Sequence, residues 1–242
     1  MGKLDGKVAL ITGGNKGIGK GIARGLAAEG ASLVLAARGT EALNQTVAEL
    51  TQGGATVLGV STDVTDEAQV EALFAKAMER FNRLDILVNN AGAFDGGPID
   101  TLSVEAWDKV IGVNLRGPFL CTRAAMRIMK KQGGGRIINI GSISAQRVRP
   151  NSAPYSTSKF GIWGLTQVTA LEGRPHGIAA SCLHPGNTLV ERVSSRPQPP
   201  AEPMMAVDDL AQAAVLMATL PPHVNMLEAI VMPVEQLYIG RG

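Results

Sequence analysis

The sequence predicts an α/β fold in which a doubly wound parallel sheet is covered by helices on both faces. Short apolar segments alternate along the chain with segments whose apolar residues recur at helical spacing. The short segments are apolar at nearly every position, which is typical of strands buried on both faces. A glycine cluster also joins the first apolar segment to the first helical one. The composition does not shift over residues 1–242, so we expect a single domain.

The strands are expected where a short apolar run is bounded by glycine or polar residues. The first of them, Val-Ala-Leu-Ile, leads directly into the glycine cluster, which marks a tight turn. Six further runs have the same character. The expected strands are 8–11, 32–37, 56–61, 85–89, 136–140, 178–183 and 229–232.

The helices are expected where apolar residues recur every three or four positions. Thr65 is expected to cap the third helix, because its hydroxyl can accept a hydrogen bond from a free N–H group of the first turn. Asp66 and Glu67 would then lie near the positive end of the helix dipole. The expected helices are 17–29, 40–51, 66–81, 104–131, 155–171 and 208–220.

Composition excludes several classes of protein. Hydrophobic residues make up 45% of the chain and charged residues 18%, which excludes disordered and coiled-coil proteins. A formal net charge of +2 favours neither nucleic acid nor an anionic membrane as a partner. Because the sequence has no leader-like apolar start and no run of about 18 apolar residues, we expect a cytoplasmic protein. Cys121 and Cys182 are too few for a disulfide scaffold, and without a Cys/His cluster we expect no metal site.

The glycine-rich turn after the first strand predicts a dinucleotide site. Glycines let the backbone approach a pyrophosphate, and the free N–H groups at a helix N-terminus attract its charge. A strand-to-helix junction is where such a site belongs, although an ordinary glycine-rich loop is the alternative. The residues expected at the pyrophosphate are Gly13, Asn15, Lys16, Gly17, Ile18 and Gly19.

The end of the second strand favours NADP(H) over NAD(H). An NAD site usually has an acidic residue near this point for the ribose hydroxyls, and Ala37 cannot serve in that way. Arg38 can instead pair with a 2′-phosphate, because the guanidinium fork fits phosphate geometry. Lys16 would add a second positive charge. The alternative is that both are solvated surface cations.

Four motifs occur in an order that resembles the short-chain dehydrogenase/reductase family in its single-domain form. They are Thr12-Gly13-x-x-x-Gly17-x-Gly19, Asn89-Asn90-Ala91-Gly92, a strand ending near Ser142, and Tyr155-x-x-x-Lys159. The resemblance covers nearly the whole chain. It implies a seven-stranded Rossmann sheet, a nicotinamide cofactor and assembly into a homotetramer or homodimer.

The resemblance places the catalytic roles on Asn114, Ser142, Tyr155 and Lys159. Residues four apart on a helix share a face, so Tyr155 and Lys159 should lie together. Free tyrosine ionises near pH 10, and an ammonium beside it favours the phenolate and makes it a better acid or base at neutral pH. Ser142 would bond the substrate oxygen, although Ser144 is an alternative. Asn114 would hold a water that relays protons to Lys159, or serve only as a turn residue.

The resemblance also implies cofactor contacts beyond the glycine turn. Asp63 would contact the adenine, with a plain residue before a helix as the alternative. Asn90 would lie beside the cofactor and in part brace the sheet, and the hydroxyl of Thr188 would bond the carboxamide. His184 would be structural or face the nicotinamide. The implied contacts, with those of Tyr155 and Lys159, are Asp63, Val64, Asn90, Ala91, Gly92, Pro185, Gly186 and Thr188.

We therefore expect an NADP(H)-dependent oxidoreductase that moves a hydride between nicotinamide and a carbonyl or secondary alcohol, with tyrosine as the general acid or base. The substrate would be a 3-oxoacyl thioester, or a small hydroxy acid or aldehyde. Its specificity should lie in the loops 93–99, 144–150 and 187–203. A non-catalytic NADP-binding sensor or scaffold on the same fold is the alternative.

Overall fold

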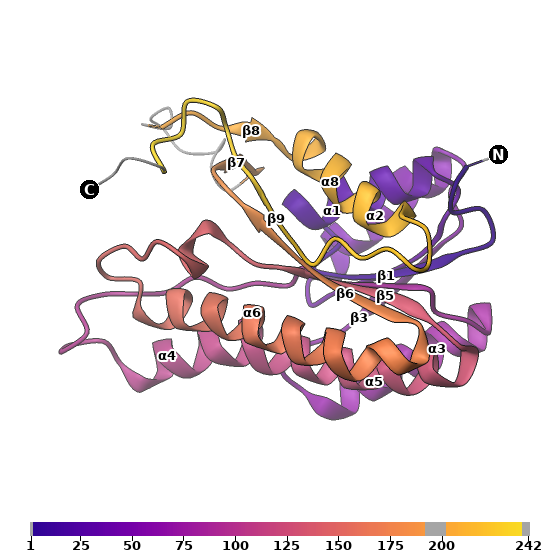
Figure 1. Ribbon diagram of the computed structural model, residues 1–242, viewed down its shortest axis with the longest axis horizontal. Helices are drawn as coiled ribbons and strands as arrows, with labels where there is room; N and C mark the ends of the chain where they lie inside the picture. Colours follow the sequence, from indigo (N-terminus) through magenta and orange to yellow (C-terminus); the bar gives the residue numbers. More distant parts are fainter. Residues whose placement is uncertain (1, 192–201, 239–242) are drawn as a thin grey trace.

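The computed structural model describes residues 2–191 and 202–238, which form a seven-stranded parallel sheet with helices on both faces (Figure 1). The strands, in the order β3-β2-β1-β4-β5-β6-β9, confirm the predicted doubly wound sheet. In chain order they are β1 (Val8–Thr12), β2 (Ser32–Ala37), β3 (Val57–Ser61), β4 (Ile86–Asn89), β5 (Gly135–Ile140), β6 (Ile178–Pro185) and β9 (Glu228–Val231). The α-helices are α1 (Gly17–Ala28), α2 (Thr40–Gln52), α3 (Glu67–Phe81), α4 (Val104–Ile111), α5 (Gly117–Gln132), α6 (Ala153–Gly173) and α8 (Val207–Thr219).

Each face of the sheet has its own hydrophobic core. Successive side chains of a strand point to opposite faces, so β1 contributes Ala9 and Ile11 to one core and Val8 and Leu10 to the other. The first core is closed by α1, α2 and α8, and the second by α3 and α5, with α4 and α6 in the same layer (Figure 1). Full burial of one such Leu or Ile side chain contributes about 1.5–3 kcal/mol. The two-sided cores explain why the strands lack a polar alternation.

The order of the strands reverses beside β1. This strand pairs with β2 on one side and with β4 on the other, so the chain crosses over in opposite directions from it. Open α/β sheets bind their ligands in the crevice that forms outside the carboxyl ends of the strands at such a point. The glycine turn after β1, the loop after β4 and the loop after β5 all lie at this edge of the sheet.

The prediction of one continuous helix over 104–131 is wrong. The helix is divided into α4 and α5 by a π-helical turn, η1 (Gly112–Arg116), in which the Gly117 N–H donates to the Gly112 carbonyl. An α-helical bond to the Asn114 carbonyl would need the N–H of residue 118, and this residue is Pro118. Proline therefore accounts for the irregular turn, and turns of this kind are frequent at functional sites.

The prediction that Thr65 caps the third helix is also wrong. The cap is Asp66, whose Oδ1 accepts the Gln69 N–H at 3.1 Å, and the helix begins one residue later. The Thr65 hydroxyl and N–H are both donated to Asp63 Oδ1, at 2.8 and 2.9 Å. Thr65 thus closes a short turn with Asp63, and the helix begins after the next residue, Asp66.

A small two-stranded sheet was not predicted. β7 (Thr188–Leu189) pairs in parallel with β8 (Met205–Ala206), and the chain then enters α8 directly. Within the expected specificity loop 187–203, residues 192–201 lie outside the described part of the chain. The pairing nevertheless fixes both ends of this loop over the carboxyl edge of the sheet (Figure 1).

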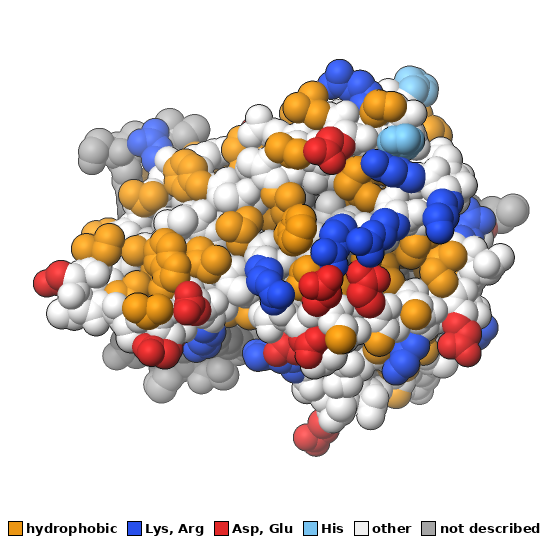
Figure 2. Space-filling view, turned by 90° about the horizontal axis from the view of Figure 1, so that it is seen from below, with side chains coloured by type: hydrophobic (Ala, Val, Ile, Leu, Met, Phe, Trp, Pro, Cys, Tyr) orange, Lys and Arg blue, Asp and Glu red, His pale blue; other side chains and the backbone are white. Residues whose placement is uncertain are grey.

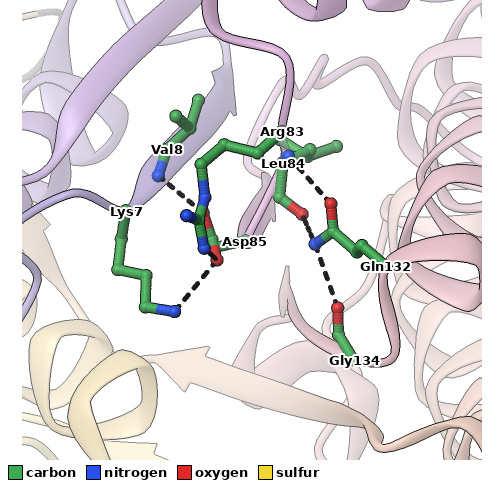
Figure 3. A network of polar contacts seen from close by, with 7 residues as sticks. All are labelled: Lys7, Val8, Arg83, Leu84, Asp85, Gln132 and Gly134. Atoms are coloured by element: carbon green, nitrogen blue, oxygen red, sulfur yellow. Dashed lines mark hydrogen bonds and ion pairs between the residues drawn. The ribbon is translucent and has the colours of Figure 1, made fainter.

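At the amino edge of the sheet, a polar network joins the starts of β1 and β4 (Figure 3). The Asp85 carboxylate accepts from Val8 N–H at 2.9 Å, from two nitrogens of Arg83 at 2.7 Å each, and from Lys7 Nζ at 3.2 Å. The Gln132 side chain bonds both the N–H and the carbonyl of Leu84. This network lies opposite the candidate site and holds the sheet together there.

Within the described ranges, no helix combines the length and the apolar character needed to cross a lipid bilayer.

Candidate active site

The glycine turn forms a close-fitting backbone cradle at the start of α1. Gly13 and Gly17 have φ angles of +63° and +53°, which side-chain-bearing residues rarely adopt. A Cβ at Gly19 would lie 2.3 Å from the Gly13 carbonyl oxygen. Lys16 is exposed, and its side chain makes no capping bond to the helix. The turn therefore needs glycine at these positions, as the sequence predicted.

Asn90 braces this turn against β4. Its Nδ2 donates to the carbonyls of Thr12 and Gly13, at 3.0 Å each. In return, Thr12 Oγ1 accepts the N–H groups of Asn90 and Ala91, at 3.0 Å each. The glycine turn and the loop after β4 are thus one rigid unit. Asn90 therefore braces the structure, which is one of the two roles expected for it.

The N-terminus of α1 is contacted by a carboxylate that the sequence analysis did not identify. Both oxygens of Glu191, just beyond β7, lie on the Gly17 N–H, at 2.9 and 3.1 Å. A Cβ on Gly17 would lie 3.2 Å from Val190 Cγ1, so this segment rests closely on the turn. An acidic side chain is favoured there by the helix dipole. Glu191 shows that the turn accommodates a negative group.

Arg38 and Asp63 lie together at the carboxyl ends of β2 and β3. Arg38 NH1 is 3.8 Å from Asp63 Oδ2, and the arginine side chain is 71% exposed. An ion pair so exposed contributes little to stability, about 0–1 kcal/mol, so the guanidinium is available to another anion. Val64 is buried, and its side chain packs over Gly117.

Tyr155 and Lys159 lie one turn apart on α6, as expected. Lys159 is only 7% exposed, and its Nζ donates to the Ile140 carbonyl at 2.8 Å. The ammonium lies 5.6 Å from the centre of the Tyr155 ring, which also packs on Phe94 with 5.3 Å between centroids. A buried ammonium is costly unless it is hydrogen-bonded. The Ile140 carbonyl therefore holds the lysine at the end of β5, two residues before Ser142.

Ser142 presents its hydroxyl from a 3-10 turn that follows β5. Its Oγ accepts the Ser144 N–H at 3.1 Å. A hydroxyl that accepts one bond still has its own proton to donate. The position at the strand end is as predicted. The Ser144 main chain supports Ser142.

Asn114 lies in the π turn and ties it to two neighbouring elements. Its Oδ1 accepts the Ala93 N–H at 2.7 Å, while its Nδ2 donates to the Ala93 carbonyl at 2.9 Å and to Ser158 Oγ at 3.2 Å. Both N–H groups of the side-chain amide are thus donated, to the loop after β4 and to α6, and its oxygen accepts from the same loop.

The C-terminal segment packs on the loop after β6. Gln236, which the sequence analysis did not single out, is buried, and its Oε1 accepts the Asn187 N–H at 2.8 Å. A Cβ at Gly186 would lie 2.4 Å from the same oxygen, so the contact requires glycine at 186. The Thr188 hydroxyl donates to the Gly186 carbonyl at 3.1 Å. The loop is therefore preformed by contacts within the chain.

Comparisons with known proteins identify a family and several relatives of this chain. The family model described as short chain dehydrogenase matches residues 7–200. A 3-oxoacyl-[acyl-carrier-protein] reductase from Synechocystis is 36% identical over 201 residues, which cover 81% of each chain. An uncharacterized oxidoreductase from Staphylococcus aureus is 36% identical over 234 residues, covering 97% of this chain and 100% of its own.

Two solved structures are similar over nearly the whole chain. An alcohol dehydrogenase from the archaeon Thermococcus sibiricus, complexed with 5-hydroxy-NADP, has a TM-score of 0.87 and 31% identity, and the match covers 95% of this chain and 97% of that one. A metagenomic short-chain oxidoreductase in complex with NADP has a TM-score of 0.85 and 33% identity, with 96% and 98% covered.

Proposed function

The chain belongs to the short-chain dehydrogenase family, and on that premise we propose that it is an NADP(H)-dependent oxidoreductase acting on a carbonyl or secondary alcohol. One observation carries the proposal: the buried ammonium of Lys159 is held on the Ile140 carbonyl one helical turn from Tyr155. An ammonium fixed beside a phenol favours the phenolate form and so assists transfer of the phenol proton.

The residues at the carboxyl edge of the sheet fit a dinucleotide. The glycine turn is a cradle that any side chain at Gly13 or Gly19 would fill, and the Gly17 N–H already bonds the carboxylate of Glu191. A helix N-terminus that accepts a carboxylate offers the same N–H group and dipole to a phosphate. We assign the pyrophosphate to this turn and the nicotinamide to the loop from Pro185 to Thr188.

The exposed guanidinium of Arg38 supports NADP(H) over NAD(H). The position after β2 carries no acidic side chain, and the exposed arginine is suited to a 2′-phosphate. Asp63, held by Thr65 on one oxygen, would lie at the adenine. The two solved relatives contain NADP or 5-hydroxy-NADP, which supports the same choice.

The cofactor would supply the hydride, and the protein would supply the proton and the geometry. In the reductive direction, the Tyr155 hydroxyl gives its proton to the substrate oxygen, and Lys159 stabilises the phenolate that is left. The Ser142 hydroxyl, whose Oγ already accepts from Ser144, donates to the same substrate oxygen. Asn114 would hold, through its turn, the water that returns a proton to Lys159.

The relatives point to two substrate classes, and both should be tested. The 3-oxoacyl-[acyl-carrier-protein] reductase relative points to 3-oxoacyl thioesters, whereas the alcohol dehydrogenase relative points to smaller alcohols and carbonyls. A panel of 3-oxoacyl thioesters, small 3-hydroxy acids, aldehydes and ketones, followed by the absorbance of NADPH, should identify one class with a clearly higher kcat/KM.

Substitution of the site residues tests the mechanism. Tyr155→Phe should lower kcat by about 100- to 10,000-fold, the usual contribution of a positioned general acid, while NADPH binding measured by fluorescence is retained. Ser142→Ala should also lose turnover, whereas Ser144→Ala should not, because it retains the N–H that supports Ser142. Full activity of Tyr155→Phe would refute the mechanism. NADPH binding by the wild type without turnover of any substrate would favour a sensor.

A further inference from the structure

His184 lies behind the loop that carries Ser142, and its ring is completely enclosed. The side chain is 0% exposed, and Trp163 on α6 packs against it in a T-shaped arrangement with 6.2 Å between ring centroids. A Cβ added to Gly141 would lie 2.5 Å from His184 Nδ1. The imidazole can therefore approach the main chain at the end of β5 only because residue 141 is glycine.

The two ring nitrogens face different groups. Nδ1 lies 3.2 Å from the Ser142 N–H nitrogen and 2.9 Å from the Ser142 carbonyl oxygen. Nε2 is buried 3.2 Å from Glu228 Oε1, off the line of a well-directed hydrogen bond, so the carboxylate acts on it mainly through its charge. Nδ1 can accept from the N–H of Ser142 or donate to its carbonyl, but one nitrogen cannot do both. Which bond forms depends on where the ring carries its proton.

The surroundings favour a neutral ring. Burial lowers the pKa of His184, and the nearby ammonium of Lys159 acts in the same direction, against the opposing effects of the Ser142 carbonyl, to which a charged ring could donate, and the Glu228 charge. A neutral imidazole carries one proton. If that proton were on Nδ1, the lone pair of Nε2 would face the negative charge of Glu228. A proton on Nε2 removes this repulsion and leaves Nδ1 as an acceptor for the Ser142 N–H. The lone pair of Nδ1 then lies 2.9 Å from the Ser142 carbonyl oxygen, but this oxygen belongs to a neutral dipole, whereas Glu228 carries a full negative charge.

Glu228 is itself held in place. Gln146, in the loop after Ser142, donates from Nε2 to Glu228 Oε1 at 2.8 Å. The side chain of Glu228 is only partly exposed, and its strand pairs with β6 beside His184. The carboxylate, the ring and the Ser142 main chain therefore form one connected unit across β9, β6 and β5.

We propose that His184 is a positioning residue for Ser142, held by Glu228 in the Nε2–H tautomer so that Nδ1 accepts the Ser142 N–H. The ring fixes the main chain from which the Ser142 hydroxyl is presented, and it touches neither substrate nor cofactor. The importance of this contact for turnover rests on the proposed function, whereas the tautomer does not.

The tautomer can be measured without cofactor or substrate. Long-range proton–nitrogen NMR spectra of the full chain at pH 7 distinguish the two neutral tautomers and the imidazolium for each of the three histidines. Loss of one signal in His176→Gln and another in His223→Gln, both at exposed positions, assigns the third to His184. We expect the neutral Nε2–H form, and a shift towards Nδ1–H in Glu228→Ala. A wild-type ring in the Nδ1–H or imidazolium form would overturn the proposal.

Kinetics test the consequence for Ser142. Glu228→Ala should lower kcat about 10-fold by loosening the serine loop, with little change in the KM for substrate or the Kd for NADPH. Glu235→Ala, at another exposed acid of the C-terminal segment, is the control and should match the wild type.

Substitutions of His184 itself test whether the acceptor at Nδ1 is what turnover requires. His184→Asn retains an acceptor near the position of Nδ1 and should keep kcat within about 3-fold, whereas His184→Leu should lose about 10- to 100-fold. Equal losses in Asn and Leu variants, or an unchanged kcat in Glu228→Ala despite a shifted tautomer, would contradict the positioning role. If the wild type shows no turnover, the proposed function fails and the NMR spectra still decide the tautomer.

Discussion

At the scale of single residues, Glu191 stands where the charge of a cofactor is expected. Its two carboxylate oxygens lie on the Gly17 N–H, the group that a pyrophosphate would use. Two negative groups cannot share this helix end without repulsion. If the pyrophosphate binds at this turn as we propose, it displaces Glu191, and the negative charge of Glu191 should weaken the affinity of the protein for NADPH.

We expect Glu191→Gln to bind NADPH about 2- to 5-fold more tightly, because a charge at a helix terminus is worth about 0.3–1 kcal/mol. Fluorescence titration with NADPH at low and high salt measures the effect, which should shrink as salt screens the repulsion. Glu172→Gln, at an exposed acid far along α6, is the control. Unchanged or weaker binding by Glu191→Gln would show that the carboxylate does not compete.

Arg38 should decide between the two nicotinamide cofactors. We expect Arg38→Asp to weaken NADPH binding about 10- to 100-fold, because it replaces a charge-assisted pairing with repulsion from the 2′-phosphate, and to weaken NADH binding far less. Parallel titrations with both cofactors measure the ratio. Lys76→Glu, a similar charge reversal at an exposed position on α3, should alter neither affinity. Equal weakening of both cofactors by Arg38→Asp would overturn the assignment.

The sequence could predict those site residues whose relation is local. The four-residue spacing of Tyr155 and Lys159 on one helix is enough to place them together. Glu191 could not be found in this way, because it lies 174 residues from Gly17 and the contact depends on the path of the chain beyond β7. The buried position of Gln236 over Gly186 is likewise a product of tertiary packing.

At the scale of elements, the five inner strands were predictable because both of their faces are buried, whereas the edge strands β3 and β9 are partly exposed. Their apolar runs have no polar alternation to confuse with loops, and every predicted strand is present in the sheet. The π turn could not be read from periodicity, since one wide turn hardly disturbs an apolar stripe. Pro118 was the available signal, because it removes the donor that the Asn114 carbonyl would use in an α-helix.

The junction of β1 and β4 should depend on Asp85. Burial alone would raise the pKa of this carboxyl, but hydrogen bonds from Arg83, the Val8 N–H and Lys7 outweigh it and hold the pKa below its usual value. We expect Asp85→Asn to lower the free energy of unfolding by about 1–3 kcal/mol. Urea unfolding at pH 7 measures the loss. Asp208→Asn, which breaks an exposed ion pair with Arg24, should cost under about 1 kcal/mol.

The effect of Asp85 should also depend on pH. Because the pKa of the carboxyl is lower in the folded state, its stabilising contribution is present above the unfolded pKa, about 3.9, and is lost as the pH falls through the folded value. The stability difference between wild type and Asp85→Asn should therefore be constant near neutral pH and shrink below about pH 4. A difference that does not change down to pH 2 would show that the charge of Asp85 is not what joins the strands.

At the scale of the whole molecule, large apolar side chains remain exposed on the layer formed by α4, α5 and α6. Figure 2 views the molecule from this side, and apolar side chains gather on part of the surface beside a region rich in charged groups. Phe119 on α5 and Phe160 on α6 are each 47% exposed, and Leu171 at the end of α6 is 60% exposed. Large apolar side chains exposed together on one face are typical of an interaction site. A second copy of the chain is the partner that the family resemblance implies.

We expect the protein to be a homotetramer or homodimer in solution, with Phe160 in the contact. A stable contact buries about 1,200–2,000 Å², and each phenylalanine that it covers contributes up to about 3 kcal/mol. Phe160→Lys would place a charge in that contact and should shift the mass from light scattering to a smaller species. Gln45→Lys, which adds the same charge on α2 in the opposite layer, should leave the mass unchanged. A monomeric wild type, or the same assembly in Phe160→Lys, would show that this face is not where copies meet. Because Tyr155 and Lys159 lie on the same helix, loss of the assembly should also lower kcat if the contact stiffens α6.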